Sequence, residues 1–386
     1  MLATSMLFAT LVIAPHALAA LAIIEYDVPT GSSTPYSITA GPDGNLWFTE
    51  NTGNKIGKIT PSGAITEYVV PTSNATLTGI TTGPDGNLWF GEGNANKIGK
   101  ITTGGVITEY NIPTTNGGPW GIITGPDGNL WFTETLKNKI GKITTSGVVT
   151  EYALPSGVEP TGITPGPDGN LWFVEESAYI GKITTNGTIT EYNVGGNIRF
   201  DIITGPDGNL WFTDYIGNNI GKITTSGTVT NYAIPTSNAY PRGIITGPDG
   251  NLWFTEGGVG KLGKITLSGA ITEEDLSSSS AQPVELVTGP DNNIWFTESF
   301  INKIGALTGV PVIGQNSNST SGTNGANSSN NNQTADPAAP ETGFGEPANS
   351  SVVRLLAAAS LLSIGAGIAL VGRPRILQLR THRSCK

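Results

Sequence analysis

One acidic position recurs through this sequence and is its clearest candidate for chemistry. It lies two residues after the Phe of a repeated Gly-Pro-Asp-Gly-Asn-Leu-Trp-Phe motif. The seven copies place there Glu50, Glu92, Glu134, Glu175, Asp214, Glu256 and Glu298. A ring of carboxylates would offer the oxygen ligands that Mg²⁺ and Ca²⁺ prefer. Alternatively, each acid pairs with a neighbouring lysine, as Glu50 could with Lys55 or Lys58, in exposed ion pairs worth about 0–1 kcal/mol each.

A second position of the repeat varies from copy to copy. It reads Tyr36, Thr78, Trp120, Thr161, Phe200, Arg242 and Val284. If Gly41 pairs with Gly44 across the turn of the motif, Tyr36 lies opposite Thr49 and at the same rim as Glu50. Aromatic side chains beside a cation suit a sugar ring or a cyclic peptide. We therefore predict a ligand-binding rim that is formed by Tyr36, Trp120, Phe200 and Arg242.

The repeats also define the architecture that must position these side chains. The motifs begin at Gly41, Gly83, Gly125, Gly166, Gly205, Gly247 and, in a degenerate copy, Gly289, with spacings of 42, 42, 41, 39, 42 and 42 residues. The first unit predicts strands at Tyr36–Ala40, Asn45–Glu50, Lys55–Thr60 and Ala64–Val70, separated by turns that contain Gly or Pro. Four strands in a period of about 40 residues are typical of a β-propeller blade. The sequence thus predicts an all-β propeller of seven four-stranded blades.

The two ends of the repeat region predict how the ring closes. The seventh unit has strands at Val284–Thr288, Asn293–Glu298 and Lys303–Leu307 but no fourth strand. Residues Ala22–Pro29 (AIIEYDVP) match the fourth strand of the first unit, Ala64–Pro71 (AITEYVVP). We therefore expect the N-terminal strand to complete the last blade and cover its exposed edge.

Composition excludes several classes of protein. The 386 residues include 53 Gly and 25 Pro, and no stretch before the C-terminal end keeps a helical apolar period without them. A net charge of -10 makes a nucleic-acid partner improbable, because phosphate binding needs a basic face. One Cys excludes a disulfide framework. The two histidines, His16 and His382, lie at the extremities, which excludes a Cys/His zinc site in the repeats.

The N-terminal residues 1–19 are typical of a secretory signal peptide. A short apolar run, Leu7–Ala14, precedes the small-residue cleavage pattern Ala17-Leu18-Ala19. No Lys or Arg occurs before Lys55, so the segment is either an atypical signal or begins downstream of the true start. We expect the repeats of residues 20–309 to be exported.

The C-terminal residues predict attachment to the cell surface. Residues 310–338, rich in Asn, Ser, Thr and Gly, are typical of a flexible stalk. Residues 339–386 contain Ala-Pro-Glu-Thr-Gly, a 17-residue apolar run at Leu355–Val371 and a basic tail. This order resembles an LPxTG-type sorting signal, with Ala339 in place of the usual Leu, and the resemblance implies that a sortase cuts between Thr342 and Gly343 and joins the chain to peptidoglycan. The alternative is a plain single-span membrane anchor.

The repeated GPDGNLWFTE, NKIGKIT and ITEY segments resemble the virginiamycin B lyase (streptogramin lyase) family of seven-bladed propellers. The resemblance covers Ile23 to about Gly309. It implies a Mg²⁺-assisted elimination that opens a cyclic depsipeptide, with a histidine as general base. The family often has Pro-His-Gly-Ile where this chain has Pro119-Trp120-Gly121-Ile122 and Pro241-Arg242-Gly243-Ile244. Neither Trp120 nor Arg242 can act as that base at neutral pH.

The residues therefore favour a binding protein over an enzyme. We expect a monomeric, extracellular propeller that binds a glycan or peptide at its rim, with no assigned catalytic residue and with Mg²⁺ or Ca²⁺ as the cofactor to test. A lyase acting on a cyclic depsipeptide is the alternative function. Because the two ends hold six of the 20 Lys and Arg but one of the 30 Asp and Glu, the remaining body has a net charge of -15, which favours cationic ligands.

Overall fold

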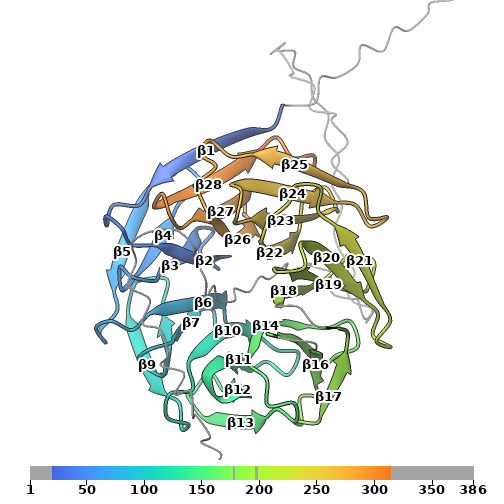
Figure 1. Ribbon diagram of the computed structural model, residues 1–386. Coiled ribbons are helices and arrows are strands. Elements are labelled where there is room, and N and C mark those ends of the chain that lie inside the picture. Colours follow the sequence, from blue (N-terminus) through green and yellow to red (C-terminus); the bar gives the residue numbers. More distant parts are fainter. Residues whose placement is uncertain (1–19, 177–178, 196–198, 314–386) are drawn as a thin grey trace, which may run out of the picture.

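The chain forms seven four-stranded antiparallel sheets arranged as blades around one axis (Figure 1). The computed structural model describes residues 20–176, 179–195 and 199–313. The signal peptide, the sorting signal with Thr342 and Gly343, and the apolar run Leu355–Val371 lie outside these residues. Within the described ranges no helix has both the length and the apolar character to cross a membrane.

The strands follow one another from the axis outward in each blade. The innermost strands are β2 (Pro35–Ala40), β6 (Leu77–Thr82), β10 (Pro119–Thr124), β14 (Pro160–Pro165), β18 (Arg199–Thr204), β22 (Pro241–Thr246) and β26 (Pro283–Thr288). The second strands are β3 (Leu46–Glu50), β7 (Leu88–Glu92), β11 (Leu130–Glu134), β15 (Leu171–Glu175), β19 (Leu210–Asp214), β23 (Leu252–Glu256) and β27 (Ile294–Glu298). The third strands are β4 (Lys55–Ile59), β8 (Lys97–Ile101), β12 (Lys139–Ile143), β16 (Tyr179–Ile183), β20 (Asn219–Ile223), β24 (Lys261–Ile265) and β28 (Lys303–Thr308). The outer strands are β5 (Ile65–Val69), β9 (Ile107–Asn111), β13 (Val149–Ala153), β17 (Ile189–Asn193), β21 (Val229–Ala233), β25 (Ile271–Asp275) and β1 (Ala22–Asp27). A 3₁₀ turn, η1 (Thr135–Lys137), follows β11.

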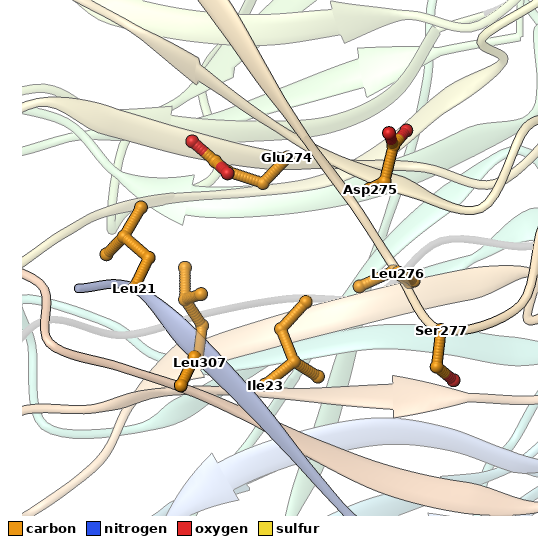
Figure 2. Close-up of a pocket in the computed structure, with 8 residues that line it drawn as sticks. Leu21, Ile23, Glu274, Asp275, Leu276, Ser277 and Leu307 are labelled. Atoms are coloured by element: carbon orange, nitrogen blue, oxygen red, sulfur yellow. The ribbon is translucent and has the colours of Figure 1, made fainter.

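This arrangement confirms the predicted seven-bladed propeller and its closure. The last sheet has the order β1-β28-β27-β26, so the N-terminal strand supplies the outer strand of the final blade. Tyr26 of β1 stacks on Trp295 of β27 with ring centroids 5.6 Å apart, as the equivalent Tyr does in the first five blades. The seam between β1 and the neighbouring β25 leaves a cavity of about 330 Å³, which Figure 2 shows in close-up. Its lining is mainly Leu21, Ile23, Leu276 and Leu307, with Glu274 and Asp275 at one side.

The Trp and Phe of each motif hold adjacent blades together. Neighbouring residues of a strand point to opposite faces. Trp47 therefore packs among residues of the second blade, and Phe48 packs among residues of the closing blade. Gly57 faces Phe48 on the next strand, and a Cβ there would lie 2.1 Å from the Phe ring. Only glycine lets the ring close on that strand.

The rest of the motif fixes the Trp. The Trp47 indole N–H donates to Asp43 Oδ1 at 3.0 Å, and the Lys58 ammonium lies 5.2 Å from the indole ring centre. Tyr68 of the outer strand stacks on the indole with centroids 5.5 Å apart, and the same ammonium lies 5.9 Å from the Tyr68 ring centre. A Cβ on Gly41 would fall 2.5 Å from the indole. The repeated Gly-Pro-Asp-Gly-Asn-Leu-Trp-Phe sequence is thus a packing motif.

The pairing of the first two strands differs from the predicted register. Ala40 pairs with Leu46 and Pro35 pairs with Glu50, so the register shifts by one residue over Tyr36 and Ser37. The same irregularity occurs in all seven blades. At the bulge, Ser37 N–H donates to Thr49 Oγ1 at 3.1 Å, and Thr49 in turn donates to the Thr78 carbonyl of the next blade at 2.8 Å. The bulge frees backbone groups for hydrogen bonds between blades.

A charged latch holds the loop that connects successive blades. Glu109 of β9 accepts the backbone N–H of Thr72 at 2.9 Å and its hydroxyl at 2.8 Å. The Lys97 ammonium lies 2.7 Å from Glu109 Oε2 and donates to the Thr72 hydroxyl. Equivalent Thr–Glu–Lys latches occur at Thr30–Glu67–Lys55, Thr114–Glu151–Lys139 and Thr236–Glu273–Lys261. Blade five has Asn231 and Asn219 at the Glu and Lys positions.

The latch predicts an asymmetric response to substitution. We expect Glu109→Gln to lower the free energy of unfolding by about 1–3 kcal/mol, because it weakens charge-assisted hydrogen bonds to a largely buried carboxylate. Asn231→Ala, at the exposed equivalent position of blade five, is the matched control and should change it by less than about 0.5 kcal/mol. Denaturant unfolding measures both. Equal losses in the two variants would contradict the latch.

Candidate functional site

The inner strands bring the predicted rim residues together on the axis. Tyr36, Phe200 and Val284 belong to one buried cluster with Tyr215. Trp120 packs against this cluster, as does Tyr240. These side chains come from five of the seven blades. The rim position of the inner strand supplies Tyr36, Trp120, Phe200 and Val284, whereas Tyr215 follows β19 and Tyr240 precedes β22. A position that varies along the sequence thus becomes a single contiguous cluster.

The rings are arranged around the Arg242 guanidinium. Its central carbon lies 5.8 Å from the ring centroid of Phe200 and 5.8 Å from that of Tyr215. Tyr36 meets Trp120 edge to face at 5.4 Å, and Tyr215 lies 5.0 Å from Tyr240. Aromatic faces attract a cation, which explains how Arg242 is held in an apolar cluster.

Burial divides this cluster into an enclosed floor and a partly exposed pair, Trp120 and Tyr240, which we call the mouth. Arg242 is 6% exposed, Tyr36 is 5% exposed and Phe200 is 1% exposed, so these side chains mostly contact one another. Trp120 and Tyr240 are partly exposed. Of the four predicted rim residues, therefore, Trp120 offers the most surface to a ligand, and Tyr240 joins it.

Two buried carboxylates lie beside the cluster, and the sequence analysis missed both. Asp201 and Glu285 follow the rim residues Phe200 and Val284, and each is 0% exposed. The equivalent position is Gly in four blades and Ser37 in the first. A carboxylate at a position otherwise occupied by Gly or Ser was the signal that could have found them.

The two carboxylates have unequal partners. Asp201 Oδ1 accepts the Ile202 N–H at 2.8 Å, and Oδ2 accepts the Ile244 N–H of the next blade at 3.2 Å. Glu285 has only the Leu286 N–H as a backbone donor, in a contact that falls short of full hydrogen-bond geometry. Burial raises the pKa of Glu285 well above its usual value, the charge of Asp201 raises it further, and Arg242 opposes the rise. Burial also raises the pKa of Asp201 well above its usual value.

The seven acids at the ends of the second strands do not gather into one site. Each lies in its own blade and is buried, as Glu50 and Glu134 are at 0% exposure. They lie under the connecting loops, since a Cβ on Gly117 would be 2.7 Å from Glu134 Oε2. Within the described ranges no three His, Cys, Asp or Glu side chains gather as a metal site would require. This ring therefore does not fit a shared Mg²⁺ or Ca²⁺, and no reaction step is derived through one.

For Glu50, the predicted alternative of an ion pair with Lys55 or Lys58 is wrong. Lys55 lies opposite Glu50 in the strand register, yet its ammonium is 2.7 Å from Glu67. Lys58 stacks on Trp47 and lies 3.9 Å from Asp43. Glu67 also accepts the hydroxyl of Thr30 from the connecting loop. Glu67, Lys55 and Thr30 therefore form one hydrogen-bonded group, which leaves Lys55 with Glu67 as its ion-pair partner.

Because these glutamates are buried and have no lysine within ion-pair distance, burial favours their protonated, neutral form. It raises the pKa of Glu50 and Glu175 to about 7 and that of Glu92, Glu134, Glu256 and Glu298 to about 8. In most blades the second cause is the latch glutamate, as Glu109 is for Glu92. In the fifth blade the carboxylate at this position, Asp214, accepts the Gly217 N–H on Oδ1 at 2.9 Å.

The sequence matches the virginiamycin B lyase family over residues 18–158 and 122–323, which together span the whole propeller. The chain belongs to this family.

Solved structures of virginiamycin B lyases share the propeller closely. The Staphylococcus aureus enzyme is 42% identical, with a TM-score of 0.71 over 75% of this chain and 99% of that one. A streptogramin B lyase is 40% identical, with a TM-score of 0.71 over 74% and 97%. Curated virginiamycin B lyases align over short stretches only. The alignments are 54% identical over 39 residues for Bacillus licheniformis and 49% over 41 residues for Saccharopolyspora erythraea, so the chain spans 13% and 14% of those relatives.

One virginiamycin B lyase structure bears directly on catalysis. A His-to-Ala variant of the S. aureus enzyme, 41% identical to this chain, is catalytically inactive and was solved with quinupristin. In the present chain the only histidines are His16 and His382, which lie outside the propeller. The propeller of this family member therefore contains no histidine. The buried acidic groups beside its axial cluster are the carboxyls of Asp201 and Glu285.

The raised pKa values predict that stability falls as pH rises. A carboxyl with a pKa of about 8 in the fold keeps its proton, whereas the unfolded chain ionises above about pH 4.3, so unfolding is favoured progressively between the two. Glu92→Gln cannot ionise. We expect its advantage over the wild type in free energy of unfolding to grow by at least about 1 kcal/mol between pH 5 and pH 8.

Denaturant unfolding at pH 5, 6, 7 and 8 measures this difference. Asp27→Asn is the control, because that carboxylate is 87% exposed, and it should leave the pH dependence unchanged. A Glu92→Gln profile parallel to the wild-type profile would contradict the buried, protonated state of Glu92.

Proposed function

We propose that the propeller is an extracellular binding module that holds its ligand over the axial aromatic cluster. The observation that carries the proposal is the arrangement of Trp120 and Tyr240 as a partly exposed aromatic mouth above the buried Arg242 and Phe200. Partly exposed aromatic side chains suit the apolar face of a sugar ring or a cyclic peptide. Rigid packing of all seven blades pre-forms the mouth.

The lyase reaction is the second candidate, and family membership is the observation that favours it. An elimination needs a base that reaches the proton it removes. Where related chains often carry histidine, this chain has Trp120 and Arg242. Asp201 and Glu285 have the raised pKa that a carboxyl base needs, but both are fully buried beneath the mouth. These features support binding without turnover.

Quinupristin, the molecule held by the S. aureus structure, distinguishes the two functions. We expect isothermal titration calorimetry to detect its binding and chromatography to detect no conversion, with or without Mg²⁺. Chromatographic retention is the right readout, since an elimination leaves the total mass unchanged. Mg²⁺-dependent conversion would overturn the non-catalytic proposal, and the absence of binding would exclude this cyclic depsipeptide as a ligand.

Substitution of Trp120 tests the location of the site. We expect Trp120→Ala to weaken ligand binding at least about tenfold, because a stacked aromatic contact is worth about 1–3 kcal/mol. Tyr179→Ala is the matched control, since Tyr179 begins the third strand of its blade, away from the axis. Equal losses in both variants would place the ligand elsewhere.

We also propose that the propeller is exported and attached to the cell wall. Support comes from the sequence of residues 1–19 and 339–386, which lie outside the described part of the chain. We expect the native protein in the muramidase-released wall fraction and Thr342→Ala in the membrane fraction, because the sortase cannot process it. A wild-type protein found only in the membrane fraction would favour the plain membrane anchor.

A further inference from the structure

One copy of the variable rim position carries a charge. The seven residues there are Tyr36, Thr78, Trp120, Thr161, Phe200, Arg242 and Val284. Arg242 is 6% exposed and lies among aromatic rings. Threonine and valine fill the same position in other blades, so the packing of a blade does not require an arginine here. The charge of Arg242 is therefore a feature of the axis, and it needs a partner there.

Two copies of one loop position accommodate this side chain. The position directly follows the second strand and is Tyr215 in the fifth blade and Gly257 in the sixth. The Tyr215 ring centroid lies 5.8 Å from the central carbon of the guanidinium. A Cβ on Gly257 would lie 2.8 Å from Arg242 Nε, so a larger residue there would displace the arginine. The residues of both loops thus leave a fitted space for the guanidinium in the floor of the mouth.

The guanidinium has no anion beside it among the described residues. Arg242 Nε is buried and has no hydrogen-bond partner, and no ion pair joins the guanidinium to a carboxylate within the described ranges. An arginine keeps its proton in proteins, so burial cannot neutralise it as it can a carboxyl. Aromatic faces offset part of the cost of burying this charge. A carboxylate with both oxygens in the plane of the guanidinium would offset more.

The two neighbouring carboxyls do not take this role. Asp201 accepts the backbone N–H groups of Ile202 and Ile244. Burial raises the pKa of Asp201 and that of Glu285 well above their usual values, so both carboxyls favour the neutral form. The charge of Arg242 therefore has no internal counter-ion at neutral pH.

The mouth lies one ring away from this charge. Tyr215 contacts the guanidinium and also lies 5.0 Å from Tyr240, which is partly exposed. A uronic acid suits this arrangement, because one rigid sugar ring carries both an apolar face and a carboxylate. An acidic peptide carries its carboxylate on a flexible side chain and loses more conformational entropy when it is held at one opening. The observations therefore favour an acidic glycan over an acidic peptide.

We propose that Arg242 determines the specificity of the mouth by binding the carboxylate of a uronic acid in an acidic glycan. This inference rests on the binding function proposed above and names the class of ligand. The sugar ring lies on Trp120 and Tyr240, and its carboxylate accepts hydrogen bonds from the guanidinium. The net charge of -15 on the body of the chain opposes this contact only weakly, because exposed charges farther away than about 8 Å are largely screened at physiological ionic strength.

Trigalacturonate and its methyl ester test the proposal, because the two ligands share their sugar rings and differ in the free carboxylates. We expect isothermal titration calorimetry of the full chain at pH 7 to show that the acid binds at least about tenfold more tightly than the ester. The reason is that charge-assisted hydrogen bonds are stronger than neutral ones.

Substitution of Arg242 locates the carboxylate. Arg242→Thr introduces the residue that Thr78 and Thr161 already place at this position, so the variant is compatible with the fold. We expect it to bind the acid and the ester equally. Lys137→Thr is the matched control, since it removes an exposed positive charge from η1, and it should retain the wild-type preference for the acid. Circular dichroism confirms that each variant is folded.

Four outcomes would overturn the proposal. The first is a wild-type chain that does not bind trigalacturonate or binds the acid and the ester equally. The second is a preference for the acid that persists in Arg242→Thr. The third is a preference that appears only in Glu285→Gln, which would make Glu285 the counter-ion of Arg242. The fourth is an Asp-Gly hexapeptide that binds more tightly than trigalacturonate.

Quinupristin separates a failure of this inference from a failure of the proposed function. If the same preparation binds quinupristin and loses that binding in Trp120→Ala, the mouth is a binding site whatever the result with trigalacturonate. Any of the four outcomes above would then overturn the carboxylate specificity alone.

Discussion

Packing between adjacent blades is the constraint on which the rest of this structure depends. In every blade the second strand sends a Trp to one neighbouring blade and a Phe to the other, and all fourteen rings are buried. Each ring needs a glycine close by, as Trp47 needs Gly41 and Phe48 needs Gly57. This requirement fixes the sequence of the turn, the second strand and the third strand. Variation is left to the axial end of the first strand and to the latches, and that is where the units differ.

The sequence was sufficient to predict the architecture because the constraint repeats. The spacing of the motifs gave the number of blades, and the unmatched Ala22–Pro29 segment gave the closure at β28. Local geometry was less accessible. The bulge at Tyr36 and Ser37 allows hydrogen bonds to the next blade. The pairing rules for an isolated hairpin do not include contacts with a neighbouring sheet, so they could not predict it. The ion-pair partner of Lys55 was mispredicted for the same reason. Its ammonium pairs with Glu67 and not with Glu50, because the loop from the preceding blade places the Thr30 hydroxyl beside Glu67.

The candidate site shows that the circular arrangement of the blades brings together side chains that are far apart in the chain. Residues of one repeat position were predicted to share a rim, and the structure packs Tyr36, Phe200 and Arg242 into a nearly closed cluster. How much of each ring remains exposed depends on the diameter of the axis and on the neighbours, which periodicity does not encode. Asp201 and Glu285 escaped notice because carboxyls in strands are ordinary on a surface. They become unusual only when the position is known to face another blade. The packing motifs carry the family membership, whereas the function has to be argued from the axial residues.

The closing strand has a mechanical consequence. Ala22 pairs with Thr308, so the first and last strands of the ring begin and end at the same corner of one sheet. Tension that pulls the two chain ends apart would peel β1 from β28 one residue pair at a time, which requires little force. Tension between the C-terminal end and a load held at the axis would instead slide β28 along β1 and β27 together, so both ladders must fail at once. The propeller therefore resists little force when it is pulled by its two chain ends. It resists more force when it is pulled between its C-terminal end and a load bound at the axis.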